Sequence, residues 1–560
     1  MKLPLRITIL LLGVAAFTQG QTALSTIMPS DLKPLNITEV PTFDHDVLLL
    51  EDTRIEEEGG RTNHGRIAEI NLNCTQDGVW STMPNGDSVW QLRVKTEGAI
   101  AVSAFFSQLA LPVGSTLILY PIDRSYYVGP YTHEDCIPEG IFATSEVLGD
   151  DAILEYYQPA SVVGTAKIAI RGIGHFYRNI YDFRDENSER GGGSAACEVD
   201  INCPEGDDWQ QERDAVVRLT LVEGNFIGNC TGRLVNNTAL DCKKYILTAL
   251  HCAVDASASD LLSSSVTFGY QRSGCGTGAA STVKTKTGLV RRADSNDNGG
   301  DSGSDFLLME MDDPIPASWN PFWAGWESSS TAPGACIGIH HPAGDAKKIS
   351  TTNANTYSGS WGASGTHWGV EWIATESGWG VTEGGSSGSP LFNMNHRIVG
   401  TLTGGGSCCT TNGCGPGTSP TADDSYGKMN RHWTSNPNAA NQKLKVWLDP
   451  GNTGITSLGG SYNNIGSACT PALAIEELLN FSDIQLYPNL ASNYVNIYSE
   501  KYQRITEIRM FDSAGLLIRS FNMNTDKIEV DLSGTPNGLY YFSFIESGGN
   551  HVTKKLTVIH

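Results

Sequence analysis

Long apolar runs are missing from this chain of 560 residues. Apart from its start, no stretch approaches the ~20 apolar residues that a membrane-spanning helix needs. At the start, Lys2 and Arg6 precede an apolar core from Ile7 to Phe17, with a small residue at Gly20. That core is too short to span a bilayer, and the pattern is typical of a secretory signal peptide. We therefore expect a signal peptide at residues 1–20, export, and no transmembrane segment.

Basic residues are also few. The chain has 38 Lys and Arg against 61 Asp and Glu, a formal net charge of −23. Phosphate binding requires clustered Lys and Arg, so this balance argues against nucleic acid as a partner. It favours partners of positive charge.

A metal-ligand pattern is not recognisable either. His340 and His341 are adjacent, but no carboxylate or third ligand stands near them at a typical spacing. We expect no metal and no cofactor, and we find no internal repeats.

Cysteine, in contrast, is present 13 times. In an exported chain this number indicates an oxidised disulfide framework, whose pairing cannot be determined from spacing. The odd count leaves at least one thiol unpaired.

The most informative segment is Gly384–Pro390, with the sequence Gly-Gly-Ser-Ser-Gly-Ser-Pro. It has the features of a nucleophile loop centred on Ser387, and the upstream segment Thr248–Cys252 contains His251. A serine hydroxyl is a weak nucleophile unless a histidine accepts its proton, and the histidine needs a carboxylate to orient it. A third, acidic residue is therefore required.

Asp305 is the best candidate, because it directly precedes the apolar, strand-like run Phe306–Met311. The other acids of this region lie in turn-like sequence and are interpreted as solvated: Asp294, Asp297, Asp301, Asp312 and Asp313. The resulting order, His251, Asp305, Ser387, differs from Ser-Asp-His hydrolases and from Asp-His-Ser subtilisin-like enzymes.

These residues resemble the chymotrypsin-like serine proteases, and within them the bacterial lysyl endopeptidases, from about Cys197 to about Pro450. The resemblance is carried by seven ordered segments: Cys197–Gly206, Cys230–Thr238, Leu247–Cys252, Asp305–Leu308, Phe322–Trp326, Ile339–Pro342 and Val381–Pro390. It implies an all-β domain of two packed antiparallel β-barrels with the active site between them. Short strands between Gly-, Ser- and Asn-rich turns agree with that fold.

The resemblance also implies the roles of the residues. Ser387 would form an acyl-enzyme, His251 would act as general base and then acid, and Asp305 would orient it. The amides of Gly385 and Ser387 would hold the oxyanion, and glycine supplies the backbone dihedrals that such a turn needs.

Specificity would depend on Asp424, which stands two residues before the Tyr426-Gly427 pair, where lysyl endopeptidases carry their pocket aspartate. Out of context it would be interpreted as a surface turn acid. An aspartate does not by itself distinguish Lys from Arg, so trypsin-like cleavage after both stays open. Trp361 matches the tryptophan that the family often places beside the catalytic histidine, whereas Thr403 replaces the family's histidine.

Disulfide pairing is implied by the resemblance alone. It suggests Cys230 with Cys252, Cys203 with Cys275, and Cys197 with either Cys408 or Cys409. Cys414 could pair with whichever of Cys408 and Cys409 does not pair with Cys197, and Cys74 could pair with Cys136.

Residues 21–190 are interpreted as a β-rich propeptide, with strand-like runs at Ser88–Val94, Ser115–Tyr120 and Ala166–Arg171. The polar linker Arg184–Ser194 should be accessible to proteases, and the expected cut follows Arg190. A strictly Lys-specific enzyme would not make that cut itself, so either Arg is tolerated or another protease activates the zymogen. The protease domain would span residues 191–458.

Residues 459–482 are interpreted as a linker, and residues 483–560 alternate between strands and turns. This last part resembles the C-terminal sorting domain of type IX secretion cargo, a small β-sandwich. The alternative is a generic carbohydrate-binding or adhesion sandwich. The sorting domain implies passage through the periplasm to the outer surface or the medium, with the type IX machinery as a partner.

Together these features predict a secreted serine endopeptidase made as a zymogen. Its partners would be its own propeptide and protein or peptide substrates with Lys, and under the alternative also Arg, before the cut. A further alternative, from another class, is an inactive protease-like scaffold that serves in surface binding or adhesion.

Overall fold

The computed structural model contains two compact units, residues 1–471 and 472–560. The residues that it describes are 32–57, 60–178, 193–278, 280, 284–353, 356–410, 417–435, 439–462, 484–488, 490–499, 502, 505–513, 516–546 and 551–560. The predicted signal peptide, the linker around Arg190, and Cys414 lie outside them.

Among its described residues, the leading segment of the first unit contains one α-helix and eleven strands. In chain order they are β1 (Ile37–Glu39), α1 (His45–Glu57), β2 (Thr62–Asn73), β3 (Val79–Thr82), β4 (Ser88–Lys95), β5 (Ala101–Ala110), β6 (Thr116–Pro121), β7 (Val128–Tyr131), β8 (Phe142–Ala143), β9 (Val147–Leu148), β10 (Asp151–Gln158) and β11 (Lys167–Phe176). The three predicted strand runs correspond to β4, β6 and β11.

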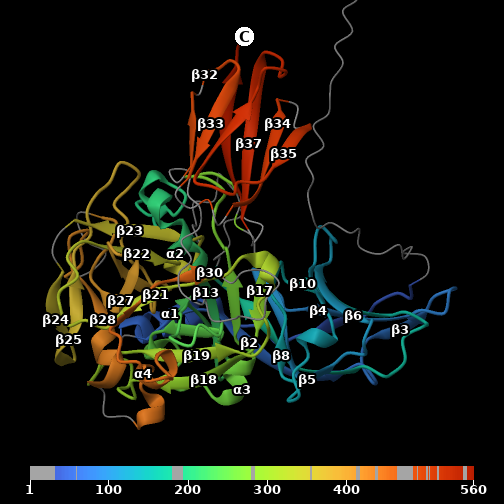
Figure 1. The fold of residues 1–560 in the computed structure, drawn as a ribbon. Coiled ribbons are helices and arrows are strands. Elements are labelled where there is room, and N and C mark those ends of the chain that lie inside the picture. Colours follow the sequence, from blue (N-terminus) through green and yellow to red (C-terminus); the bar gives the residue numbers. More distant parts are fainter. Residues whose placement is uncertain are drawn as a thin grey trace, which may run out of the picture. The chain divides into compact units, whose positions relative to one another are not determined.

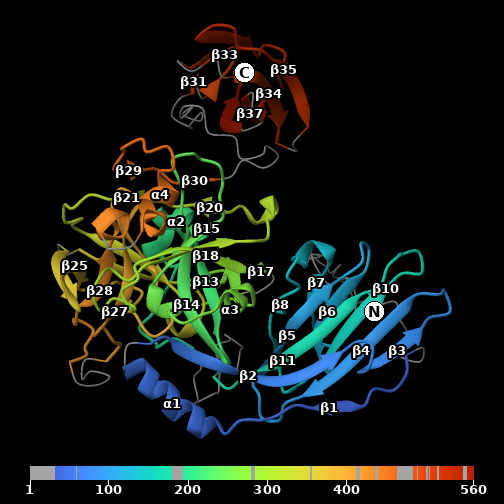
Figure 2. The ribbon, with the colours of Figure 1, turned by 90° about the horizontal axis from the view of Figure 1, so that it is seen from below.

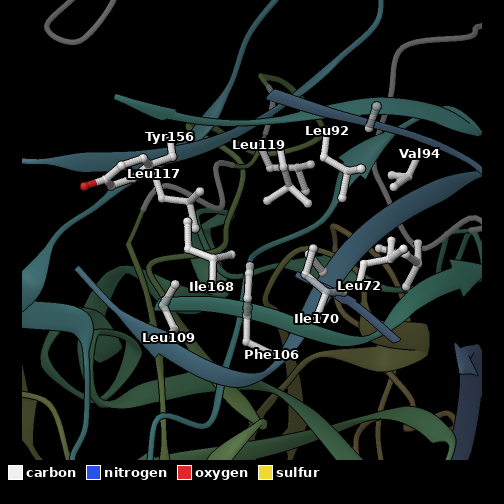
Figure 3. Close-up of a cluster of buried hydrophobic side chains, with 14 of the residues drawn as sticks. Leu72, Leu92, Val94, Phe106, Leu109, Leu117, Leu119, Tyr156, Ile168 and Ile170 are labelled. Atoms are coloured by element: carbon white, nitrogen blue, oxygen red, sulfur yellow. The ribbon is translucent and has the colours of Figure 1, made fainter. Parts of the chain in front are cut away.

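The core of the leading segment lies between two sheets (Figure 3). Side chains of β4, β6 and β10, such as Leu92, Leu119 and Tyr156, lie opposite side chains of β2, β5 and β11, such as Phe106 and Ile170. All five side chains are at most 2% exposed. Alternation of apolar and polar residues along each strand places one face of each sheet in this core.

The predicted protease part starts with β12 (Val199–Asp200), which belongs to the sheet of the second barrel, and continues with the elements of the first barrel. The latter are α2 (Gln210–Ala215), β13 (Val216–Glu223), β14 (Phe226–Leu234), β15 (Tyr245–Thr248), α3 (Ala258–Leu262), β16 (Ser265–Phe268), β17 (Thr285–Thr287), β18 (Leu289–Asp294) and β19 (Leu307–Met311). The pairing order β17-β16-β13-β14-β15-β19-β18 forms the barrel sheet, whereas β12 pairs with β23 of the second barrel.

The second barrel follows along the chain. Its elements are β20 (Phe322–Trp323), β21 (Gly325–Glu327), β22 (Cys336–His340), β23 (Lys348–Thr352), β24 (Tyr357–Trp361), β25 (Ala363–Val370), β26 (Pro390–Asn393), β27 (Arg397–Gly405), β28 (Asp424–Lys428), α4 (Leu444–Leu448), β29 (Ser457–Leu458) and β30 (Ser461–Tyr462). The sheet order is β12-β23-β22-β26-β27-β28-β25-β24. The expected all-β fold with two barrels is confirmed. Strand β30, which pairs with β20, lies beyond residue 458, the predicted end of the protease domain.

The leading segment and the first barrel share one sheet. Strand β2 pairs with β11 on one side and with β14 on the other, so that twelve strands form a continuous sheet. Figure 2 shows β2 extending from the protease part into the leading segment. No helix in the described part of the chain is long and apolar enough to cross a membrane.

The second unit is a separate β-sandwich (Figure 1). Its strands are β31 (Gln485–Tyr487), β32 (Leu490–Ala491), β33 (Tyr494–Tyr498), β34 (Ile505–Asp512), β35 (Leu517–Phe521), β36 (Lys527–Asp531), β37 (Gly538–Glu546) and β38 (His551–Val558). One sheet has the order β31-β33-β36 and the other β32-β38-β37-β34-β35. Buried side chains such as Ile497, Ile508 and Phe542 form its core, which confirms the predicted small sandwich.

Candidate active site

His251 and Asp305 form a buried pair. His251 lies in a short 3₁₀ turn directly after β15, and Asp305 lies two residues before β19, the strand that pairs with β15. The Nδ1 atom of His251 is 2.7 Å from one oxygen of the Asp305 carboxylate, and the other oxygen accepts the backbone N–H of His251 at 3.0 Å. Burial opposes the charge of Asp305, but its contacts with His251 outweigh this effect and lower its pKa. The pair thus has the geometry of a histidine oriented by a carboxylate.

Asp297 supports the backbone of Asp305, a role that the sequence did not indicate. Asp305 has a φ of 55°, which is uncommon for a residue other than glycine. The Asp297 carboxylate accepts the N–H of Asp305 at 2.9 Å and that of Gly300 at 3.1 Å. It also accepts the hydroxyl of Ser295 at 2.6 Å. These bonds fix the loop in the conformation that directs Asp305 toward His251.

The prediction that the neighbouring acids are solvated is wrong for three of five. Asp294, Asp297 and Asp313 are 8%, 3% and 5% exposed, whereas Asp301 and Asp312 are exposed. Asp297 bonds to groups of the loop between β18 and β19, Asp294 at the end of β18 pairs with Arg291 at 3.3 Å, and Asp313, after β19, pairs with Lys286 at 3.4 Å. An acid in a Gly- and Asn-rich segment gives no sequence signal for this.

The loop that carries Ser387 is anchored to strand β14 of the first barrel. The hydroxyl of Thr231 donates to the carbonyl of Gly385 at 2.9 Å, and the Thr231 amide donates to the carbonyl of Ser387 at 2.8 Å. Arg233, which is fully buried, donates to the carbonyl of Gly388 at 2.7 Å. A Cβ atom on Gly388 would lie 2.0 Å from Thr248 Oγ1, so the loop packs closely on the segment that leads to His251.

Gly385 has a φ of 93°, in the region that glycine adopts without strain. A Cβ atom at this position would lie 2.9 Å from the amide nitrogen of Gly344 and from the carbonyl oxygen of His341. Within the described residues, the amides of Gly385 and Ser387 donate to no other protein group. Neither amide is therefore engaged by another group of the described chain.

Trp361 and Thr403 lie beside Gly300, in the loop between β18 and β19 that carries Asp305. A Cβ on Gly300 would be 3.1 Å from the Trp361 ring, 3.3 Å from Asp305 Cβ and 3.4 Å from Thr403 Cγ2. The Thr403 hydroxyl is hydrogen-bonded to the Asp305 carboxylate, and its oxygen lies 2.9 Å from Nε2 of His367. Thr403 therefore connects the acid to a second buried histidine, which the sequence did not indicate.

Asp424 is fully buried at the start of β28, so it is not a surface turn acid. One carboxylate oxygen accepts from Trp372 Nε1 at 2.6 Å and from the hydroxyls of Thr382 and Ser407 at 2.7 Å each. The other accepts the Ser407 amide at 3.2 Å. Burial raises the pKa of Asp424, although these four donors oppose the shift. Because Thr382 lies on the segment leading to Ser387, this carboxylate is tied to the nucleophile loop.

Three disulfides join described cysteines: Cys197–Cys409, Cys203–Cys275 and Cys230–Cys252. The partner of Cys197 is thus Cys409 and not Cys408, because only one of two adjacent residues can direct its sulfur toward the same partner. The suggested pair of Cys74 and Cys136 is wrong, since both are thiols. Cys230–Cys252 links β14 to the turn that carries His251.

The adjacent histidines are held by protein groups. His340 is hydrogen-bonded to the hydroxyls of Ser386 and Ser350, both at 2.8 Å, and His341 Nδ1 lies 2.9 Å from the carbonyl of Asp345. Cys230, Cys252 and His251 lie close together, but the two sulfurs are joined in a disulfide and cannot serve as thiolate ligands.

Comparison with known proteins gives matches for both units. Residues 191–427 match the family model described as lysyl endopeptidase, C-terminal domain, and residues 485–559 match the secretion system C-terminal sorting domain. A lysyl endopeptidase from Pseudomonas aeruginosa is 29% identical over 360 residues, which is 61% of this chain and 73% of that protein.

Solved structures with similarity to the chain include proteases. A Glu endopeptidase is 18% identical, with 39% of this chain and 86% of that chain covered and a TM-score of 0.25. A thermostable serine protease from an extremophilic microorganism is 11% identical, with 39% and 93% covered and a TM-score of 0.29.

Proposed function

We propose that this chain, a lysyl endopeptidase-like serine endopeptidase with a C-terminal sorting domain, hydrolyses peptide bonds on the C-terminal side of lysine. The observation that carries the proposal is the buried His251–Asp305 pair, beside which the Ser387 loop is bonded to strand β14. The similarity to a lysyl endopeptidase supports lysine as the residue before the cut.

The proposed reaction has two halves. In the first, Ser387 Oγ attacks the peptide carbonyl while His251 Nε2 accepts its proton, and the amides of Gly385 and Ser387 stabilise the oxyanion. His251 then donates that proton to the leaving amine, and the acyl-enzyme forms. In the second half, His251 activates water, which releases the acid and regenerates Ser387. Asp305 holds the imidazole and stabilises its charged form throughout.

Asp424 is the proposed recognition group for the lysine side chain. At about 4 Å, an ion pair contributes roughly 4 kcal/mol at an effective dielectric of 20, before desolvation is subtracted. The carboxylate is fixed by four donors, so little ordering is required when a compact ammonium group binds. Arg is longer and forked, and would need a wider space around the same carboxylate.

The order of the predicted segments along the chain implies the sequence of export, activation and sorting. Residues 1–20 would direct export, residues 21–190 would form the propeptide, and cleavage after Arg190 would release the protease domain from residue 191 to about 458. The sorting domain, from residue 483, sends the enzyme to the cell surface or the medium, after passage through the periplasm. An Arg at the activation site indicates that another protease makes this cut, if the enzyme is strictly lysine-specific.

Peptide amides that differ only in the residue before the bond test this proposal. We expect kcat/KM for Lys to exceed that for Leu by up to about 10³, as roughly 4 kcal/mol implies, and to exceed that for Arg. Equal rates for Lys and Arg would replace the proposal with trypsin-like specificity. No hydrolysis of any peptide would favour the inactive scaffold.

A further inference from the structure

The first strand of the leading segment lies on the edge of the strand that anchors the Ser387 loop. Strand β2 pairs antiparallel with β14, with Arg66 opposite Phe226, Gly65 opposite Ile227 and Thr62 opposite Asn229. We call residues Phe226–Asn229 the docking edge. Asn229 is two residues from Thr231, which bonds to the Ser387 loop, so β2 begins close to that loop.

Arg61, just before β2, contacts the turn that carries His251. Its guanidinium Nη1 donates to the carbonyl of Cys252 at 2.8 Å, and Nη2 donates to the carbonyl of Phe226 at 3.3 Å. Glu223 lies 3.8 Å from the same guanidinium, and Arg61 is only 3% exposed. A buried arginine is costly unless such partners are present, so this contact is specific.

Thr62, the next residue along the chain, contacts the Ser387 loop. A Cβ atom on Gly384 would lie 1.9 Å from Thr62 Oγ1, so the two residues touch. Gly384 is three residues before Ser387 in the sequence. Two successive residues of the leading segment therefore contact the histidine turn and the nucleophile loop.

We propose that the docking edge is a strand-binding surface whose occupant is residues 61–66 of this chain, and that this segment inhibits the protease even after the linker is cut. The inference rests on the proposed function, because it names the partner that keeps the site closed. An edge of unpaired N–H and C=O groups binds an extended peptide through main-chain hydrogen bonds. While β2 occupies the edge, a substrate cannot pair there.

The occupant offers no suitable bond for cleavage. Residues 34–94 contain no lysine, and the Arg61 guanidinium is bonded to backbone carbonyls of the first barrel instead of to Asp424. An enzyme that requires lysine before the cut would bind this segment without hydrolysing it.

Further contacts hold the leading segment in place. Ile67, Phe105 and Phe176 pack with Val222 and Ile227 of the first barrel in one buried cluster. The interface also has ion pairs between Arg218 and Glu146 at 3.0 Å and between Lys286 and Asp135 at 2.9 Å. A fragment with this interface should stay bound after the chain is cut.

Acid is expected to loosen the docked segment through His64. This side chain is fully buried in β2, and neither ring nitrogen has a hydrogen-bond partner among the described residues. Burial, and then the four arginines that surround it, hold its pKa well below the ordinary 6.5: Arg218 of β13, and Arg61, Arg178 and Arg66 of the leading segment. The released segment binds a proton that the docked segment excludes, so docking is strongest above pH 6.5 and weakens below it.

This acid effect is measured as the dissociation constant of the cut complex between pH 7 and 5. We expect it to increase by up to about tenfold per pH unit once His64 titrates, and we expect His64→Gln to remove this part of the slope. An unchanged slope in the His64→Gln variant would refute the assignment to His64.

The docking proposal is tested on the full-length protein, cut in the linker by an added protease. Release of the leading fragment on dilution is followed by size-exclusion chromatography and by hydrogen exchange at Phe226–Asn229, in a Ser387→Ala background. We expect Arg61→Ala to raise the dissociation constant about 10- to 100-fold. The control Arg93→Ala removes an arginine that pairs with Asp151 inside the leading segment, and should change it little. If Arg61→Ala does not fold, Thr62→Ala replaces it, with a smaller increase.

Activity is then measured on the same dilution series with Ser387 intact. The proposal predicts that activity appears as the fragment dissociates on dilution. In the Arg61→Ala variant, activity should appear at a higher protein concentration than in the protein with Arg61. Full activity while the fragment is bound, or equal dissociation for Arg61→Ala and Arg93→Ala, would overturn it. If dissociation and exchange behave as expected but no activity appears at any dilution, the docking edge stands and the proposed protease function fails.

Discussion

Replacement of Ser387 with Ala is expected to lower kcat by about 10⁶, because the nucleophile of the proposed acyl transfer is lost. The loop offers two adjacent serines, and the structure distinguishes them. The hydroxyl of Ser386 is buried, lies 2.8 Å from His340 Nδ1 and accepts the amide of Glu383 at 3.2 Å. Ser387 is half-buried, and we propose its hydroxyl as the nucleophile.

A fluorophosphonate probe, mapped to the modified peptide, measures this directly. We expect the label on Ser387 in the wild-type protein and in the control Ser386→Ala, and none in Ser387→Ala. Ser386→Ala should lose far less activity, since it removes a structural bond only. Labelling of Ser386, or activity that survives in Ser387→Ala, would show that the nucleophile is assigned wrongly.

Replacement of Asp424 with Asn is expected to lower kcat/KM for lysine peptides by about 10³, the factor that roughly 4 kcal/mol of lost charge interaction implies. Asn has the same shape but no charge, and a lysine ammonium would then enter a buried site without an anionic partner. Rates for a leucine peptide should change little. The loss is therefore one of selectivity and not of the chemical step.

Asp423→Asn is the matched control, because Asp423 is exposed and accepts the hydroxyl of Tyr357 at 2.7 Å. We expect its selectivity to stay within about twofold of the wild type, as is usual for a surface change. Equal losses in both variants, or an unchanged Lys preference in Asp424→Asn, would show that another group binds the lysine side chain.

Local sequence was sufficient for several strands and for the contact between His251 and Asp305. Strand-like apolar runs marked β4, β6, β11 and β19, since such runs depend mainly on which side chains of a strand are buried. The position of Asp305 before an apolar run likewise placed it at the end of a strand that pairs beside His251.

Contacts distant in the sequence were not predictable from the same patterns. The pairing of β2 with β14 joins strands that are more than 150 residues apart in the sequence. Burial of Asp297 depends on a loop that folds inward around Asp305. The choice of Cys409 over Cys408 depends on the direction of one side chain, which composition does not encode.

The most direct test of the central claim is mass spectrometry of a denatured proteome digested with the processed enzyme, with Ser387→Ala in parallel. The claim predicts new peptide C-termini at lysine that are absent from the Ser387→Ala digest. Cleavage at arginine as often as at lysine would contradict the proposed specificity, and identical digests with both proteins would contradict the protease function itself.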